Sequence, residues 1–362
     1  MTFPALRASR SHSFVPGLAL MLCMQAVPTA TPTASTITEI PMPTGAVIMQ
    51  ALGVNSSGDA AGYYVLANGD QHGFTWSNGA LSTLPPLALP GHGQTIAHDI
   101  SDGGVVVGNS SPTFQPNLAV VWTNGQPESL GTFGGDWSDA IGVSTNGLVA
   151  GWAMVEPGST RFHGFTYDGS SLHDVGVLLG GAATELNDIN ASGVAVGEGQ
   201  VVESHFHAIR VDPVEGILDL GTLGGVTSEA RAISDAGHIV GRAQTGERND
   251  ATFEGIVRHA FLWHQGKMID LGTLPGLIES RAMGVNSKAL VVGTANNETT
   301  TTTAPFLWRR GTMVDLNTLL PPGSGWTLRS ANAISESGAI VGEGTHDGKP
   351  RAYVLQLGMP GP

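Results

Sequence analysis

Short runs of alternating apolar and polar residues recur along most of this chain. The clearest copy runs from Ala230 to Gly276 and contains A-R-A-I-S-D-A-G-H-I-V-G, H-A-F-L-W-H-Q-G and D-L-G-T-L. Brief alternating runs bounded by Gly, Asn or Asp are typical of short strands joined by tight turns. A unit that returns every 20–50 residues or so indicates a solenoid, a propeller or an array.

Three elements define each unit. An I/V-N/S-x-x-G turn occurs at Val54–Gly58, Ile100–Gly104, Val143–Gly147, Ile189–Gly193, Ile233–Gly237, Val285–Ala289 and Ile334–Gly338. A strand of the H-A-F-L-W type occurs at His72–Trp76, Leu118–Trp122, His163–Tyr167, His207–Val211, His259–Trp263, Ala304–Trp308 and Arg351–Leu355. A strand of the D-L-G-T-L type occurs at Ala80–Leu84, Ser129–Phe133, Asp174–Leu178, Asp219–Leu223, Asp270–Leu274 and Asp315–Leu319. Each unit therefore has four predicted strands. Strand A precedes the I/V-N/S-x-x-G turn and strand B follows it, strand C is of the H-A-F-L-W type, and strand D is of the D-L-G-T-L type.

The last unit has no D strand of its own, and Glu39–Pro43 stands where a spare one is expected. A first strand that completes the last unit closes a ring and leaves no unpaired edge, whereas an open solenoid needs caps at both ends. The sequence thus predicts an all-β, seven-bladed β-propeller over residues 37–357, followed by a short tail at 358–362. In strand C, His259, Phe261 and Trp263 alternate with Ala260 and Leu262, so blades can stack a large face on a small one.

The first 36 residues have a different character. Arg7 and Arg10 precede an apolar run at Phe14–Val27 and a small-residue stretch, the order of a secretory signal peptide. We therefore expect a signal peptide with a short linker at 1–36 and an extracellular or periplasmic protein, with a retained N-terminal anchor as the alternative. Cys23, the only cysteine, lies in this segment, so disulfides would play no part in the mature fold.

The formal net charge is −14, and removal of the two N-terminal arginines makes it more negative. A surface of this sign repels nucleic acid and anionic membranes. It suits neutral sugars, cations or basic partners, and it also simply keeps an exported protein soluble. We expect a monomer without a stable membrane span.

The phrases H-A-F at His259–Phe261 and D-L-G-T-L-G-G at Asp219–Gly225 resemble the HAF-repeat family of probable extracellular bacterial proteins. The resemblance covers nearly all of the chain after the signal segment. It implies secretion and repeat architecture, and no established activity. The histidine is replaced by Leu118, Ala304 and Arg351 in three units, so no role can require every one.

In a four-stranded blade the A–B and C–D turns lie on one face of the disc, and the B–C and D–A connections lie on the other. The first set is short, and the second is long and irregular, as at 152–162, 198–206 and 242–258. Because loops on a rigid scaffold usually carry function, we expect the binding face on the B–C and D–A side.

Two groups of residues on that face are candidates for binding. Trp137, Trp152 and Trp326 could stack on sugars or anchor a protein partner, or could plug their loops. Asp139, Glu185 and Glu229 hold equivalent places in successive units near the channel, where three carboxylates could bind Ca²⁺ or simply remain solvated.

Four histidines, His72, His163, His207 and His259, number enough for a zinc site, but one per blade keeps them too far apart. We expect structural bonds to backbone or to Asp174, Asp219 and Asp270. The sequence contains no nucleophile elbow, P-loop, H-E-x-x-H or paired-cysteine motif.

The sequence is compatible with three functions. The leading hypothesis is a non-enzymatic binding or scaffold module for a carbohydrate or cell-envelope partner. The alternatives are a secreted hydrolase or lyase with carboxylates at the channel mouth, and a Ca²⁺-stabilised structural surface protein.

Overall fold

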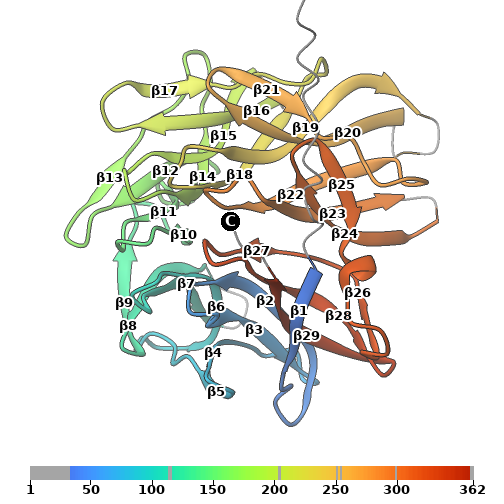
Figure 1. Cartoon of the computed structure of the whole chain (residues 1–362). Helices are drawn as coiled ribbons and strands as arrows, with labels where there is room; N and C mark the ends of the chain where they lie inside the picture. Colours follow the sequence, from blue (N-terminus) through green and yellow to red (C-terminus); the bar gives the residue numbers. More distant parts are fainter. Residues whose placement is uncertain are drawn as a thin grey trace, which may run out of the picture. The chain divides into compact units, whose positions relative to one another are not determined.

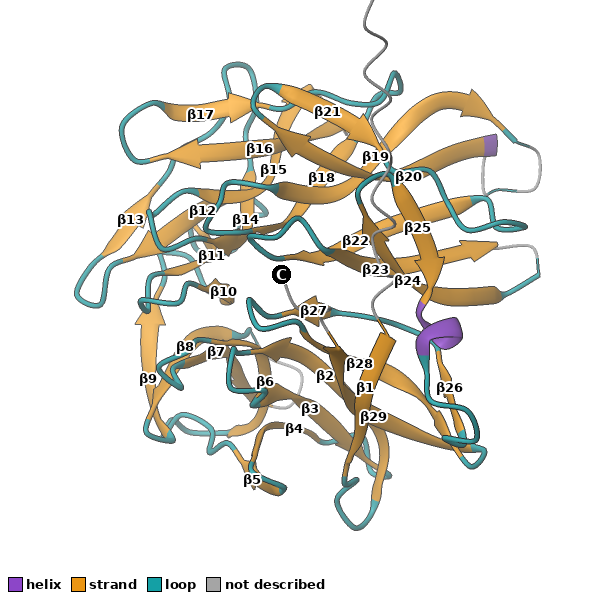
Figure 2. Ribbon diagram, in the orientation of Figure 1, coloured by secondary structure: helices purple, strands orange, loops and turns teal. Residues whose placement is uncertain are grey.

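The computed structural model describes residues 33–112, 116–202, 205–249, 252, 255–297 and 300–358. Strands and turns make up nearly all of these ranges, and a 3₁₀ turn at Leu316–Leu319 is their longest helical segment (Figure 2). The prediction of an all-β protein is confirmed. The predicted signal peptide lies outside the described residues.

Seven antiparallel sheets stand around a central channel, so residues 33–358 form a seven-bladed β-propeller, as predicted (Figure 1). Blades 1 to 3 contain β2 (Ala46–Val54), β3 (Ala60–Leu66), β4 (Gln71–Ser77), β5 (Ala80–Thr83); β6 (His92–Ile100), β7 (Val106–Pro112), β8 (Leu118–Thr123), β9 (Gln126–Gly131); β10 (Ser138–Val143), β11 (Val149–Met154), β12 (Phe162–Tyr167) and β13 (Leu172–Asp174). Blades 4 to 6 contain β14 (Thr184–Ile189), β15 (Ala195–Val202), β16 (His205–Asp212), β17 (Gly216–Asp219); β18 (Ser228–Ile233), β19 (Ile239–Arg248), β20 (Ile256–His264), β21 (Lys267–Asp270); β22 (Glu279–Val285), β23 (Val291–Asn297), β24 (Thr302–Arg309) and β25 (Thr312–Asp315). The first strand of each blade lies at the channel.

The seventh blade closes the ring with both ends of the described chain. It contains β26 (Trp326–Leu328), β27 (Ala333–Ile334), β28 (Ala339–His346), β29 (Lys349–Gly358) and the N-terminal β1 (Thr33–Ile40). Strand β1 pairs antiparallel with β29, from Thr33 opposite Gly358 to Ile40 opposite Ala352. The closing strand thus begins before Glu39–Pro43, where the sequence placed it, and the propeller begins at Thr33 rather than at 37. The register of β1 is set by its pairing with β29. The sequence could not predict this register because β1 does not contain the repeated motif.

Strand C packs each blade between its two neighbours. In blade 5, Phe261 and Trp263 lie against Ala208 and Val196 of blade 4. On the opposite face, Ala260 and Leu262 pack against Phe306 of blade 6. The Phe side chains at this position in blades 1, 3, 5 and 6 are fully buried. A large face on a small face therefore repeats around the ring, as the alternation predicts.

The A–B turns join neighbouring blades through their Asn side chains. The Nδ2 groups of Asn55, Asn190 and Asn286 donate to the carbonyl oxygens of Ser101, Ser234 and Ser335, each in the next blade, at 3.1–3.3 Å. The Oδ1 atom of each Asn also accepts backbone N–H groups within its own turn. The Asn of the repeat thus shapes a turn and links two blades at once.

Candidate functional site

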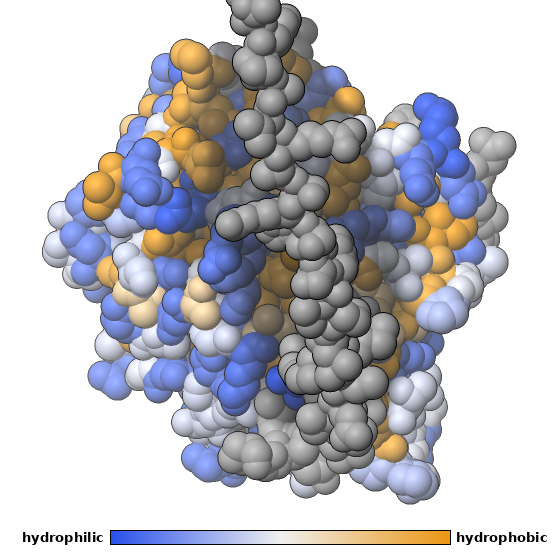
Figure 3. All heavy atoms as spheres, turned by 45° about the horizontal axis from the view of Figure 1, so that its top comes forward, coloured by the Kyte–Doolittle hydropathy of each residue, from blue (hydrophilic) through white to orange (hydrophobic). Residues whose placement is uncertain are grey.

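The face that carries the B–C and D–A connections is the irregular one, while A–B turns are uniform. One expectation needs correction: the long B–C connections of blades 4 and 5 are largely strand. β15 continues to Val202 and β19 to Arg248, so strands B and C extend as hairpins instead of open loops. In Figure 3 polar and apolar residues are interspersed over the described surface shown.

A cavity of about 190 Å³ lies between blades 4 and 5 near the B–C and D–A face. It is lined by Glu198, Phe206, Thr227, Ser228, Glu229, Arg242, Ala243, Gln244 and Arg258. Small-molecule pockets usually begin at about 300 Å³, so this one suits a single small group. Its lining combines an aromatic ring with two guanidinium groups and two carboxylates, which can hydrogen-bond and stack on a ligand.

Glu229 is the centre of an ion-pair cluster beside this cavity. Arg231 contacts its Oε1, Arg242 donates to Oε2 at 2.9 Å, and Arg281 donates to Oε1 at 3.0 Å. Burial alone would raise the pKa of Glu229, but the three arginines hold it below its usual value. The side chain is therefore a fixed anion that orders arginines from two blades.

Glu198 has a different environment at the same cavity. Burial raises its pKa to about 7, and the carboxylates of Glu229 and Glu185 add to the shift while Arg231 and Arg242 oppose it. Burial also raises the pKa of Glu185. Glu198 can thus exchange a proton near neutral pH. Sequence reasoning missed this residue because it sits in strand B, at a position without a repeat signature.

The three predicted channel carboxylates do not form a cation site. The Nε2 atom of His98 lies 3.3 Å from Asp139 Oδ1, and Asn109 Nδ2 donates to Asp139 Oδ2 at 3.0 Å. Glu229 forms ion pairs with Arg231, Arg242 and Arg281. Among the residues that the structure describes, no group of three His, Cys, Asp or Glu side chains is arranged to hold a metal ion. The calcium hypothesis therefore lacks a coordinating group there.

The three tryptophans have different environments. Trp137 is 41% exposed and remains a candidate contact residue. Trp152 lies within β11, not at the start of a loop, and packs edge-on against Phe162. Trp326 is 9% exposed and stacks on His346 with centroids 4.7 Å apart, which agrees with the alternative of a ring packed under its own loop. It therefore plugs the seventh blade.

The repeated histidines lie one per blade at the start of strand C. The Nδ1 atoms of His163, His207 and His259 lie 2.9 Å from Asp174, Asp219 and Asp270 in strand D of the same blade. His72 instead contacts the ring of Tyr64, because blade 1 has Thr83 in place of the aspartate. These contacts brace the outer strands.

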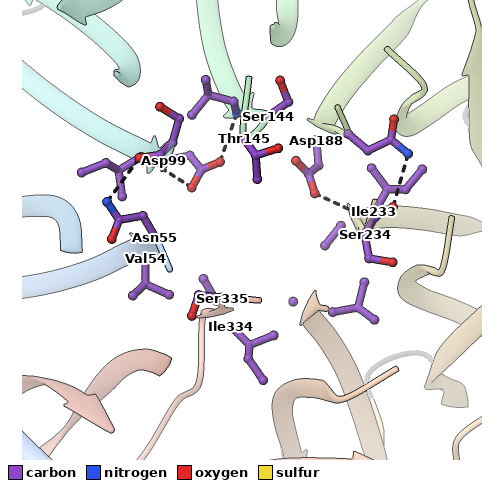
Figure 4. Close-up of a pocket in the computed structure, with 18 of the residues that line it drawn as sticks. Val54, Asn55, Asp99, Ser144, Thr145, Asp188, Ile233, Ser234, Ile334 and Ser335 are labelled. Atoms are coloured by element: carbon purple, nitrogen blue, oxygen red, sulfur yellow. Dashed lines mark hydrogen bonds between the residues drawn. The ribbon is translucent and has the colours of Figure 1, made fainter. Parts of the chain in front are cut away.

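A second and larger cavity, of about 310 Å³, occupies the channel on the A–B side (Figure 4). One residue from the innermost segment of each blade lines it. Six are β-bulge residues of the first strand, Leu52, His98, Ile141, Asn187, Arg231 and Met283, and the seventh, Asn332, directly precedes β27. The sequence pattern pointed to the opposite face and did not predict this cavity.

Asp99 and Asp188 project into this cavity (Figure 4). Asp99 accepts N–H bonds from Ile100 and from Val143 of the next blade, at 2.8 and 3.0 Å. Asp188 does the same with Ile189 and Ile233, at 2.7 and 2.8 Å.

Burial raises the pKa of Asp99 to about 6 and that of Asp188 well above its usual value. A sequence signal existed, since the equivalent positions in the other units hold only Gly or Ala. The neighbouring glycines are needed: a Cβ on Gly53 would lie 2.6 Å from Asp99 Cα.

No protein-family model matches the chain. No curated protein sequence matches it either. In the described residues we find no helix with the length and apolar character to cross a bilayer.

Three solved structures are similar to most of the chain, each at low sequence identity. A chain of the mitotic checkpoint complex is 10% identical with a TM-score of 0.45, covering 94% of this chain and 98% of that one. A gluconolactonase from Xanthomonas campestris is 10% identical with a TM-score of 0.40, covering 92% and 99%. TolB from Acinetobacter baumannii is 12% identical with a TM-score of 0.37, covering 88% and 66%. Likeness this weak says nothing about activity or ligands.

Proposed function

We propose that this protein is an exported binding module that takes up an anionic carbohydrate of the cell envelope or its surroundings. The observation that carries the proposal is the cavity between blades 4 and 5, where Phe206 lies with Arg242 and Arg258. Aromatic rings stack on the apolar faces of sugars, and guanidinium groups bind carboxylates with a matching fork of donors. This face also carries the irregular connections.

The charge balance of the site supports an acidic ligand. The chain has a net charge of −14, yet four arginines, at 231, 242, 258 and 281, gather around Glu229 and Glu279. An acidic sugar would be repelled by most of the surface and attracted here. The small cavity suits one terminal sugar ring or one carboxylate rather than a long glycan.

Export rests on the basic, apolar and small-residue order of the first 36 residues and on the resemblance to the HAF-repeat family. Both are sequence arguments. Fractionation of cells that express the full chain tests them, and a protein found only in the cytosol would refute export.

The binding proposal is tested with purified protein on uronate-containing and neutral oligosaccharides by calorimetry. We expect binding of the acidic set only, and a loss of about tenfold or more in Arg258→Gln and Phe206→Ala. Arg161→Gln is the matched control, because this arginine is 55% exposed and pairs with Glu156, which is 62% exposed, away from the cavity. Equal affinity for neutral sugars, or undiminished binding in both cavity variants, would reject the proposal.

A specific observation also favours a hydrolase or lyase as second candidate. The pKa of Glu198, about 7, suits a general acid or base near neutral pH. Asp139 and Glu229 are poorer candidates because His98 and the arginines hold them. Turnover of an acidic oligosaccharide that disappears in Glu198→Gln, with binding retained, would establish this activity. Turnover that is equal in the variant would exclude Glu198 from catalysis.

A further inference from the structure

The channel cavity on the A–B side is layered from floor to rim. Asp99 and Asp188 project into it (Figure 4). One residue further along the first strand, a Val or Ile from each blade lines the wall, each 3–8% exposed: Val54, Ile100, Val143, Ile189, Ile233, Val285 and Ile334. Hydroxyl and amide side chains of the A–B turns form the rim, together with Asp102, Asp235 and Glu336.

The charges of this lining are one-sided. Its five acids face only two basic side chains, and each of these is already paired below the cavity. His98 contacts Asp139, and Arg231 contacts Glu229. The carboxylates of Asp99 and Asp235 both act on Asp188 and disfavour its ionised form. A cation entering the cavity would therefore relieve repulsion that the lining leaves uncompensated.

Asn187 supplies an independent sign of a missing donor. This residue lines the cavity and is 6% exposed. Its Nδ2 donates to the carbonyl oxygen of Ala230 at 2.8 Å, but its Oδ1 atom is buried and accepts no hydrogen bond from the described residues. Buried acceptors of this kind are usually satisfied. It adjoins Asp188 in the chain, so a donor bound to that carboxylate would lie within its neighbourhood.

We propose that the channel cavity binds a primary ammonium group at Asp99, Asp188 and Asn187, carried on a short aliphatic stem. An ammonium has three donors, which matches two carboxylates and one amide oxygen. The Val and Ile layer would contact the methylenes, and the polar rim would remain in water. Among the described residues no three potential metal ligands converge, and an aliphatic amine needs no such cluster.

Calorimetry with 1-aminopentane at pH 8 tests the site, with 1-pentanol as the uncharged control of equal length. We expect the amine to bind and the alcohol not to bind. Asp188→Asn and Asp99→Asn should each weaken the amine about tenfold or more. Glu156→Gln, which removes one negative charge from an exposed loop, should leave the affinity unchanged.

A second measurement needs no variant, which matters because both aspartates also join blades. The amine keeps its charge between pH 5 and pH 8, whereas Asp99 is protonated at the lower pH. Binding should therefore weaken as the pH falls through about 6. The other charged groups that line the cavity are Asp102, Asp235, Glu336, Arg231 and His98, and a protonated His98 would add to the loss.

Two sources of the amine can be separated by adding Nα-acetyl-lysine methylamide. Tighter binding of this compound than of 1-aminopentane assigns the site to a lysine side chain of a partner protein, and the reverse order assigns it to a free amine. No heat from either amine at pH 8, equal binding of 1-pentanol, or affinity that is unchanged at pH 5 overturns the proposal. These outcomes are independent of the carbohydrate assay, which probes the other cavity.

Discussion

Replacing Asn286 tests how the repeat asparagine holds the ring together. The side chain is 1% exposed and makes three hydrogen bonds. Its Nδ2 donates to Ser335 of blade 7 at 3.1 Å, and its Oδ1 accepts from the backbone N–H groups of Lys288 and Leu290 at 3.1 and 3.2 Å. Asn286→Ala removes all three.

The magnitude follows from what each partner does afterwards. The N–H of the exposed Lys288 can bond to water, and the carbonyl oxygen of Ser335 keeps the bond it accepts from Gly338 N at 3.0 Å, so only the buried N–H of Leu290 is left without a partner. A net hydrogen bond contributes about 1 kcal/mol and an unsatisfied buried group costs about 1–3 kcal/mol, so we expect a loss of about 2–3 kcal/mol in Asn286→Ala.

The repeat offers a matched control. In blade 3 the same position is Ser144, whose Oγ accepts from Leu148 N at 2.8 Å within the turn. Asn286→Ser should therefore keep the bond from Leu290 and lose the link to Ser335 together with the bond from the exposed Lys288 N–H, costing about 1 kcal/mol.

Urea unfolding followed by fluorescence and circular dichroism measures both free energies, provided the two transitions coincide. Equal losses of unfolding free energy in the two variants would mean that the bond from Leu290 N within the turn contributes nothing to stability. A neutral Asn286→Ser would refute the inter-blade contribution.

Three further predictions concern stability. Ala289 holds a φ of 54° where the other turns have Gly, so Ala289→Gly should raise the free energy of unfolding by about 0.5–1 kcal/mol; a loss would show that the turn is not strained. Trp326→Ala should cost about 3–5 kcal/mol in urea unfolding and Trp137→Ala less than about 0.5 kcal/mol, because only the first ring is buried; the reverse order would contradict this. The pKa of Asp99 is raised to about 6 in the folded state, so its contribution to stability is full below pH 4 and lost as the pH rises through 6. Wild type should therefore lose about 1–3 kcal/mol relative to Asp99→Asn between pH 4 and 7, and parallel curves would count against it.

The predicted large-on-small stacking of strand C did follow from local alternation, because a strand sends successive side chains to opposite faces. The two candidate sites did not follow. Glu198 meets Glu229 and Arg242 only because blades 4 and 5 stack. Trp326 is buried because His346, on another strand of the seventh blade, lies over its ring. Such neighbours are distant in sequence, so no window of residues could place them.

By itself the sequence determined the architecture: the period, the four strands of each unit and the missing seventh D strand together require a closed ring, since an unpaired edge is unfavourable. Only the tertiary structure decided where chemistry can occur. Closing the ring directs the bulge residues of six strands into one channel and brings Asp99 and Asp188 beside glycines of their neighbours. In the sequence the two aspartates are merely departures from the repeat. Their pKa values are raised only in the folded chain, because burial removes the water around them.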